Sequence, residues 1–159
     1  MASLKQLTKE YLEYLEIEKN RALKTTENYG RYLNKFIQFL KNDNLNVLTE
    51  DNIRQYRIYL NRIQDVNGNS LKKVTQNYYI IALRNLLKYL AKRNIKSVSA
   101  EKIELGKQED RHVEFLEGHE LVRLLEAPVG QSLPALRDRA ILSTLFSTGM
   151  RVSELCALD

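Results

Sequence analysis

Apolar residues recur at intervals of three and four along the first 95 residues, with polar and charged residues between them. This spacing is the period of a helix that buries one face, and no stretch of this part alternates as a half-buried strand does. Helices are therefore predicted at about 4–18, 26–41, 50–63 and 72–93. Turn-forming Asn-Asp-Asn and Asn-Gly-Asn runs separate the last three. Four helices with short loops predict a compact, mainly α bundle.

Capping residues support three of these helices. Ser3-x-x-Gln6 is typical of a capping box at the start of the first helix. Thr25 is expected to cap the second helix and Thr49 the third, because a threonine hydroxyl accepts a hydrogen bond from a free N–H of the first turn. Two acids follow Thr49 directly, where the positive end of the helix dipole favours them.

The helical pattern lapses after the bundle. Polar and small residues are frequent over 96–113, which we interpret as an interdomain linker with a short extended piece at 102–105. Helical spacing resumes at about 118–126 and 136–147, and a further helix is expected to begin near Arg151. The predicted organisation is a bundle over 1–95, the linker, and the start of a second domain over 114–159.

Charge is divided unevenly between these parts. Residues 1–99 carry 18 Lys and Arg against 9 Asp and Glu, whereas residues 100–159 carry 7 against 11. The net charge of +5 and the pI near 9.3 therefore conceal a strongly basic first part. A basic bundle favours a polyanionic partner, and a regular polyanion is usually nucleic acid.

Other chemistries find little support. Cys156 is the single cysteine, which excludes an internal disulfide, and we interpret it as a small core residue. His112 and His119 lie near Glu114 and Glu120, but a metal site there is not favoured, and neither metal nor cofactor is expected. Because no apolar run has membrane-spanning length and no secretory signal opens the chain, a cytoplasmic protein is expected.

Two stretches, 28–42 and 66–100, contain no acidic residue. Arg and Lys mixed with Asn, Gln and Thr can anchor phosphates and hydrogen-bond to base edges, so these helices are predicted to face DNA. The acids of the first helix are expected to face away from it. The candidate contacts of the second helix and its start are Lys24, Thr25, Asn28, Arg31 and Lys35. Those of the fourth helix and its start are Lys72, Lys73, Thr75, Gln76, Asn77, Arg84 and Lys88.

Arg151 stands at the predicted start of a helix, directly after a turn. Gly149 suits the left-handed position that ends the preceding helix. Free N–H groups and a guanidinium at such a start can converge on an anion. Alternatively, Arg151 forms a surface pair with Glu154, three residues on, and the spacing alone does not decide between the two.

The string TGMRVSEL at 148–155, with RDRAIL at 137–142 before it, closely resembles the first-arginine motif of tyrosine recombinases. The string TTENY at 25–29, with the apolar positions after it, resembles the Thr-x-x-x-Tyr signature of their core-binding domain. The string ALRNLLKYL at 82–90 resembles that domain's last helix, with Leu86 where the family usually has Phe.

The resemblance implies a SAM-like four-helix core-binding domain, a linker and the first helices of a truncated catalytic domain. It implies that the second and fourth helices face DNA, and that Arg151 is the catalytic arginine that contacts the scissile phosphate. In the family a lysine, a His-x-x-Arg pair, a further His or Trp and a tyrosine nucleophile follow this motif. All nine tyrosines here precede Arg151. The chain is therefore expected to be a fragment that binds DNA without cutting it.

Three hypotheses remain open from the sequence. The first is the front half of a site-specific recombinase, whose full-length parent would act as a homo- or hetero-tetramer on a double-stranded recombination site. The second is a stand-alone helical DNA-binding regulator or recombination inhibitor without catalysis. The third is a protein-interaction bundle with incidental charge. Salt-dependent binding to duplex DNA separates the third from the other two.

Overall fold

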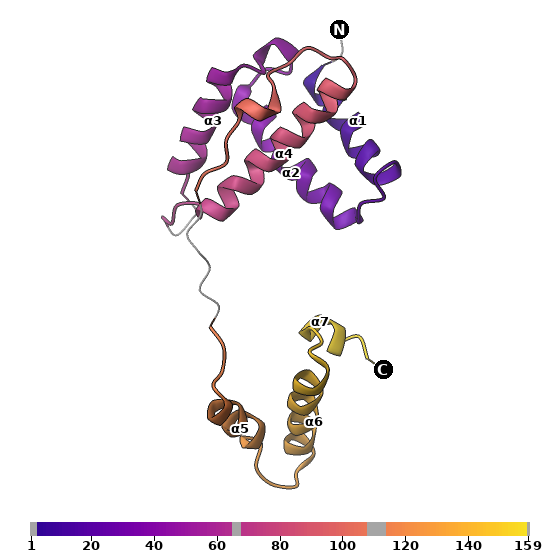
Figure 1. The fold of residues 1–159 in the computed structure, drawn as a ribbon, viewed down its shortest axis with the longest axis vertical. Coiled ribbons are helices and arrows are strands. Elements are labelled where there is room, and N and C mark those ends of the chain that lie inside the picture. The colour runs from indigo at the N-terminus through magenta and orange to yellow at the C-terminus, as the bar shows by residue number, and fades with distance from the viewer. Residues whose placement is uncertain (1–2, 65–67, 108–113, 159) are drawn as a thin grey trace. The chain divides into compact units, whose positions relative to one another are not determined.

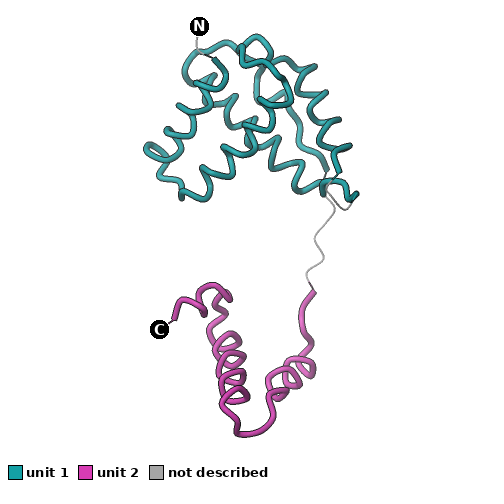
Figure 2. Tube along the Cα trace, turned by 180° about the vertical axis from the view of Figure 1, so that it is seen from behind, with its two compact units in different colours: residues 1–109 teal, residues 110–159 magenta. Residues whose placement is uncertain are grey.

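The chain forms two compact units, residues 1–109 and 110–159 (Figure 2). The structure is a computed structural model, and it describes residues 3–64, 68–107 and 114–158. In the described part of the first unit the helices are α1 (Leu4–Ile17), α2 (Leu23–Leu40), the 3₁₀ helix η1 (Leu45–Val47), α3 (Glu50–Arg62), α4 (Lys73–Lys92) and the 3₁₀ helix η2 (Ala100–Lys102). The described residues contain no strand beyond one isolated bridge between Gln64 and Ser70. The mainly helical class predicted from the sequence is confirmed.

Helix α4 is the centre of the first unit and packs against α1, α2 and α3 (Figure 1). Its apolar stripe of Leu83, Leu86 and Leu90 is completely buried. Phe36 of α2 and Tyr56 of α3 meet edge to face in the same core, with ring centroids 4.8 Å apart. Burial of these large side chains supplies most of the favourable free energy of folding, because apolar area is removed from water.

The predicted helix starts are correct in two of three cases. The Ser3 Oγ accepts from the Gln6 N–H at 3.2 Å, although the Gln6 side chain donates to Glu10 rather than completing a capping box. The Thr49 hydroxyl accepts from the Asn52 N–H, as predicted. Thr25 does not cap α2, because the helix begins at Leu23 after Ala22, three residues earlier than predicted.

The segment after α4, residues 95–107, returns along the bundle, and we call it the strap (Figure 1). Ala100 and Ile103 are buried in the core of the unit, so most of the predicted linker packs on the bundle instead of leaving it. Lys102 pairs with Glu50 at the start of α3, at 2.6 Å. Lys102 also closes η2, so the extended backbone predicted at 102–105 begins only at Ile103.

The second unit consists of α5 (Gly118–Glu126), α6 (Leu133–Thr148) and α7 (Val152–Leu155). Helix α5 has the predicted bounds, while α6 begins three residues earlier than predicted, after a Ser132 cap. None of the described residues of this unit is buried. Cys156 is exposed as well, so its interpretation as a core residue is wrong for the unit as described.

Candidate nucleic-acid interface

The outer face of α2 carries a line of polar and basic side chains, Lys24, Asn28, Arg31 and Lys35, which we call the α2 stripe. Asn28 accepts a hydrogen bond from Arg31 at 3.1 Å, and the Arg31 guanidinium lies over the Tyr32 ring. The ammonium of Lys35 lies 5.9 Å from the centre of the Tyr59 ring. These contacts hold the side chains against the surface and leave their charge facing solvent.

Lys24 is the one member of the α2 stripe whose charge is offset. Its ammonium pairs with the Glu27 carboxylate at 3.2 Å, and both side chains are more than half exposed. An exposed pair of this kind contributes little to stability and opens readily when a stronger anion arrives.

A hollow of about 470 Å³ lies where α1, α2 and α4 meet, and we call it the tyrosine hollow. Among the described residues, four cationic side chains line it, Lys19, Arg21, Lys88 and Lys92, and no carboxylate does. Thr25 of α2 lines its wall, so this predicted contact lies at the hollow although it does not cap the helix.

Tyrosines give the hollow a rigid floor. Asn85 of α4 donates a hydrogen bond to the Tyr29 hydroxyl of α2 at 3.0 Å, which ties the two helices together. Burial raises the pKa of Tyr11 beneath them, so its phenol stays neutral and adds no negative charge. Both Lys19 and Lys92 lie over the face of Tyr14, at 5.6 and 5.4 Å from its centre. Cation–π contacts of this kind orient the ammonium groups without neutralising them.

Lys19, Arg21, Lys92 and Asn85 were not among the candidates chosen from the sequence. Lys19 and Arg21 belong to the connection after α1, where no helical face exists to group them. Lys92 is in the last turn of α4, where a cation also favours the helix dipole. The common signal of the three cations was the density of basic residues around 19–21 and 88–93 in the sequence, and no such signal pointed to Asn85.

The N-terminal part of α4 differs from the prediction at one residue. Asn77 is only 4% exposed, and both polar atoms of its side chain bind the backbone of Gly106. It therefore cannot reach DNA in this structure, and we remove it from the candidate contacts. Gln76 donates to the Leu71 carbonyl at 2.7 Å, and Lys73 donates to Asn61 at 2.6 Å. Lys72 is exposed at the start of the helix and Thr75 is half-buried in its first turn.

Arg84 and Lys88 lie within electrostatic range of one acid, Glu101 of the strap. Hydrogen bonds from the Ser99 hydroxyl and from its own backbone N–H lower the pKa of Glu101, and these two cations lower it further. Arg84 is half-buried, and its Nε atom is buried without a hydrogen-bond partner in the described part of the chain. Lys88 is exposed and also lines the tyrosine hollow. Of the two, Lys88 is the better placed for a ligand in solvent.

Arg151 lies in the second unit, directly before α7. Gly149 ends α6 with φ +66°, the left-handed conformation predicted for it. The Glu154 carboxylate accepts from the Arg151 backbone N–H at 2.7 Å and pairs with the guanidinium at 3.3 Å. The Arg151 side chain is 82% exposed, so this ion pair leaves most of its N–H groups open to a further acceptor. The surface pair and the anion-binding role considered for Arg151 are therefore compatible.

Metal binding and membrane insertion receive no support from the described residues. Among them, no group of three or more His, Cys, Asp or Glu side chains is placed to hold a metal ion. His119 is exposed, and His112 lies outside the residues that the structure describes. Within the described part, no helix combines the length and apolar character needed to cross a bilayer.

Comparisons with known proteins agree with the resemblance seen in the motifs. Residues 8–94 match the family described as "Phage integrase, N-terminal SAM-like domain". The chain is similar to the tyrosine recombinase XerC of Bacillus subtilis, with 34% identity over 99% of this chain and 51% of the relative. It is similarly related to the tyrosine recombinase XerD of Staphylococcus saprophyticus, with 32% identity over 96% of this chain and 51% of the relative. The chain thus spans about half the length of these relatives. No solved structure matches the chain.

Proposed function

Because the chain belongs to the phage integrase N-terminal SAM-like domain family, we propose that it is the DNA-binding part of a site-specific tyrosine recombinase. Duplex DNA would bind along the α2 stripe and the tyrosine hollow. The observation that carries this proposal is the hollow itself, which four cations line and no carboxylate among the described residues does. Positive charge beside half-buried polar side chains such as Thr25 and Asn28 suits a phosphate backbone.

The residues of this interface divide into two kinds of contact. The lysines and arginines of the hollow would neutralise phosphates, which gives affinity without sequence preference. Asn28 and Thr25 carry hydrogen-bonding groups beside those charges, and such groups read base edges in a major groove. Asn85 is engaged with Tyr29 and is assigned to the framework rather than to recognition.

Strand cleavage is proposed for a full-length parent only. The chain would contribute Arg151, whose guanidinium can form two hydrogen bonds to the oxygens of the scissile phosphate. A tyrosine nucleophile from the remaining part of such a parent would form the covalent phosphotyrosyl link. The parent would act as a homo- or hetero-tetramer on its recombination site.

DNA binding of the 159-residue chain tests the proposal, with a labelled duplex and fluorescence anisotropy at increasing salt. The double variant Arg21→Glu/Lys92→Glu should abolish measurable binding, because both changes place a carboxylate in the hollow. The control Lys5→Glu/Lys9→Glu makes the same change of charge on the outer side of α1, and it should weaken binding only slightly. The affinity of the unmodified 159-residue chain for DNA should fall steeply as the salt concentration rises. Equal affinities of the two variants, or a flat salt response, would refute the proposal.

A further inference from the structure

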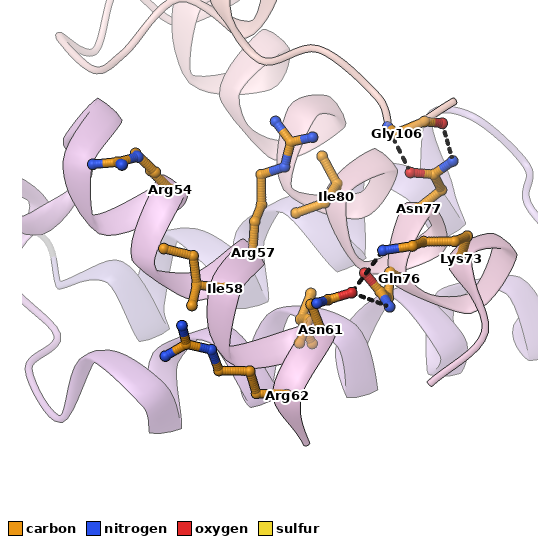
Figure 3. Close-up of a pocket in the computed structure, with 11 residues that line it drawn as sticks. Arg54, Arg57, Ile58, Asn61, Arg62, Lys73, Gln76, Asn77, Ile80 and Gly106 are labelled. Atoms are coloured by element: carbon orange, nitrogen blue, oxygen red, sulfur yellow. Dashed lines mark hydrogen bonds between the residues drawn. The ribbon is translucent and has the colours of Figure 1, made fainter. Parts of the chain in front are cut away.

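A second cationic cavity, of about 430 Å³, lies between α3 and α4, apart from the tyrosine hollow (Figure 3). Arg54, Arg57 and Arg62 of α3 and Lys73 of α4 line it, and none of its described lining residues carries a carboxylate. We call it the α3 cavity. It shares no lining residue with the tyrosine hollow.

One side of the α3 cavity is a small hydrogen-bond network with a defined polarity. The Asn61 Oδ1 accepts from Lys73 at 2.6 Å and from Gln76 at 3.4 Å. Its amide oxygen is thereby occupied, and Figure 3 shows the amide nitrogen on the side of Asn61 away from Lys73. The cavity therefore offers N–H donors from Asn61 in addition to its four cations. A site that offers donors and positive charge suits an anion.

The three arginines are not used within the described fold. None of them has an ion pair or a hydrogen bond with another described residue. Arg54, Arg57 and Arg62 are all exposed, so their charge is available to solvent. Like charges gathered on one helix repel one another, and a bound anion would relieve that repulsion.

We propose that the α3 cavity is a second contact with the DNA backbone, in which the arginines of α3 bind consecutive phosphates of one strand. This inference rests on the proposed function and extends it to a helix outside the α2 stripe and the hollow. Asn61 and Lys73 form the end of the contact nearest α4.

The arrangement of the guanidinium groups favours a repeating anion over a single small one. Figure 3 shows them spread along α3, with Arg57 directed away from Arg62, rather than converging on one point. From Arg54 to Arg62 the helix rises about 12 Å, at about 1.5 Å for each residue. One strand of duplex DNA carries a phosphate for about every 3.4 Å of its axis, so several phosphates fall within this length.

Two double variants of the full 159-residue chain test this inference. Arg54→Gln/Arg57→Gln removes two charges from the α3 cavity, and Lys5→Gln/Lys9→Gln removes two from α1 as a matched control. The cavity variant should bind a short labelled duplex about tenfold more weakly than the control, and its slope of log affinity against log salt should be lower by about two. Circular dichroism and thermal unfolding should be unchanged in both, since the altered side chains are exposed.

The NMR signals of the arginine Nε–H groups provide a second measurement. Addition of duplex DNA should shift those of Arg54 and Arg57, whereas polyglutamate at equal charge should not. If the cavity variant binds DNA as tightly as the control, while the affinity of the unmodified 159-residue chain falls steeply with salt, the inference fails and the proposed function stands. If the unmodified 159-residue chain shows no salt-dependent binding to DNA, the inference and the proposed function both fail. Shifts caused by polyglutamate and not by DNA would identify an acidic protein as the occupant and overturn the inference.

Discussion

Asn77 of α4 and Gly106 of the strap hold each other through two hydrogen bonds. The Asn77 Nδ2 donates to the Gly106 carbonyl at 2.8 Å, and the Gly106 N–H donates to the Asn77 Oδ1 at 2.9 Å. The side-chain amide thus pairs with a backbone peptide in both directions. Because Asn77 is buried, neither of its polar atoms has water as a ready alternative.

Replacement of Asn77 by Ala should therefore lower the free energy of unfolding by about 1–3 kcal/mol, the usual cost of leaving buried partners unpaired. Urea unfolding of the chain measures this change, and faster hydrogen exchange of the Gly106 amide should accompany it. Asn28→Ala is the matched control, because Asn28 bonds only to the exposed Arg31 and should change stability by less than about 0.5 kcal/mol. Equal stability of the two variants would mean that the Asn77–Gly106 hydrogen bonds contribute little to holding the strap.

A methyl group at Gly106 should disturb the same contact from the other side. A Cβ atom there would lie 3.2 Å from the Asn77 Oδ1, closer than ordinary van der Waals contact. Gly106→Ala should destabilise the chain, by less than Asn77→Ala does, because both hydrogen bonds can still form after a small shift. The double variant Asn77→Ala/Gly106→Ala should lose less free energy of unfolding than the sum of the two single losses, since both changes act on one interaction. Additive losses in urea unfolding would contradict this coupling.

The hydrogen bond between Asn85 and Tyr29 should contribute to the stability of the tyrosine hollow. Tyr29→Phe removes the hydroxyl that accepts from Asn85 and keeps the ring. We expect a loss of about 0.5–1.5 kcal/mol in thermal or urea unfolding. In a double-mutant cycle with Asn85→Ala, the second change should add little once the first is made. Tyr78→Phe is the control, since Tyr78 is 51% exposed and its loss of a hydroxyl should be neutral.

Glu101 should make the strap sensitive to acid. Its pKa is lowered below the ordinary value of 4.5, first by the hydrogen bond from Ser99, then by its own backbone N–H, and less by the charges of Lys88 and Arg84. A lowered pKa in the folded state stabilises the fold above the ordinary value, and this stabilisation is lost as the pH falls through the lower, folded value. Glu101→Gln should therefore reduce the free energy of unfolding at pH 7 and match the unmodified chain once the pH lies below the folded pKa of Glu101. Glu104→Gln makes the same change of charge at an exposed position of the strap and serves as the matched control.

The helices of the first unit could be predicted because the period of apolar residues is local information. The burial of Asn77 could not, since its partner is 29 residues away and its place beside Lys73 resembles that of a solvent-exposed residue. The packing of the strap on the bundle was not predicted for the same reason. Ala100 and Ile103 follow no helical or strand period, and only the surface of α4 gives them a place in the core.

Only some of the residues that line the tyrosine hollow were predicted from the sequence. Thr25 and Lys88 were chosen from helical faces, whereas Lys19 and Arg21 follow the end of α1 and reach the hollow only because the connection to α2 folds back. The α3 cavity was predicted only on its α4 side, where Lys73 and Gln76 had been chosen as candidate contacts. The arginines of α3 were missed because the same helix carries Glu50 and Asp51 in its first turn, so its composition does not stand out as basic.

Arg151 is expected to matter for chemistry and not for binding. In a full-length recombinase that carries this sequence, Arg151→Ala should leave DNA affinity nearly unchanged, because the first unit is proposed to supply most of the phosphate contacts. Cleavage of a recombination site should fall by about 10² to 10³, the usual effect of losing one preorganised donor at a reacting centre. Arg151→Lys should recover little, since an ammonium cannot form the two parallel hydrogen bonds of a guanidinium.

Glu154→Gln is the variant that separates this role from a structural one. The Glu154 carboxylate binds both the backbone N–H and the guanidinium of Arg151, so its neutralisation weakens the surface pair while the arginine remains. If Arg151 serves the reaction, Glu154→Gln should retain far more cleavage than Arg151→Ala. The free energies of unfolding of the two variants should agree to within about 0.5 kcal/mol, because an exposed ion pair contributes little to stability. If instead both lower the melting temperature and cleave at near the parent rate, Arg151 is a helix-capping residue and the catalytic assignment is wrong.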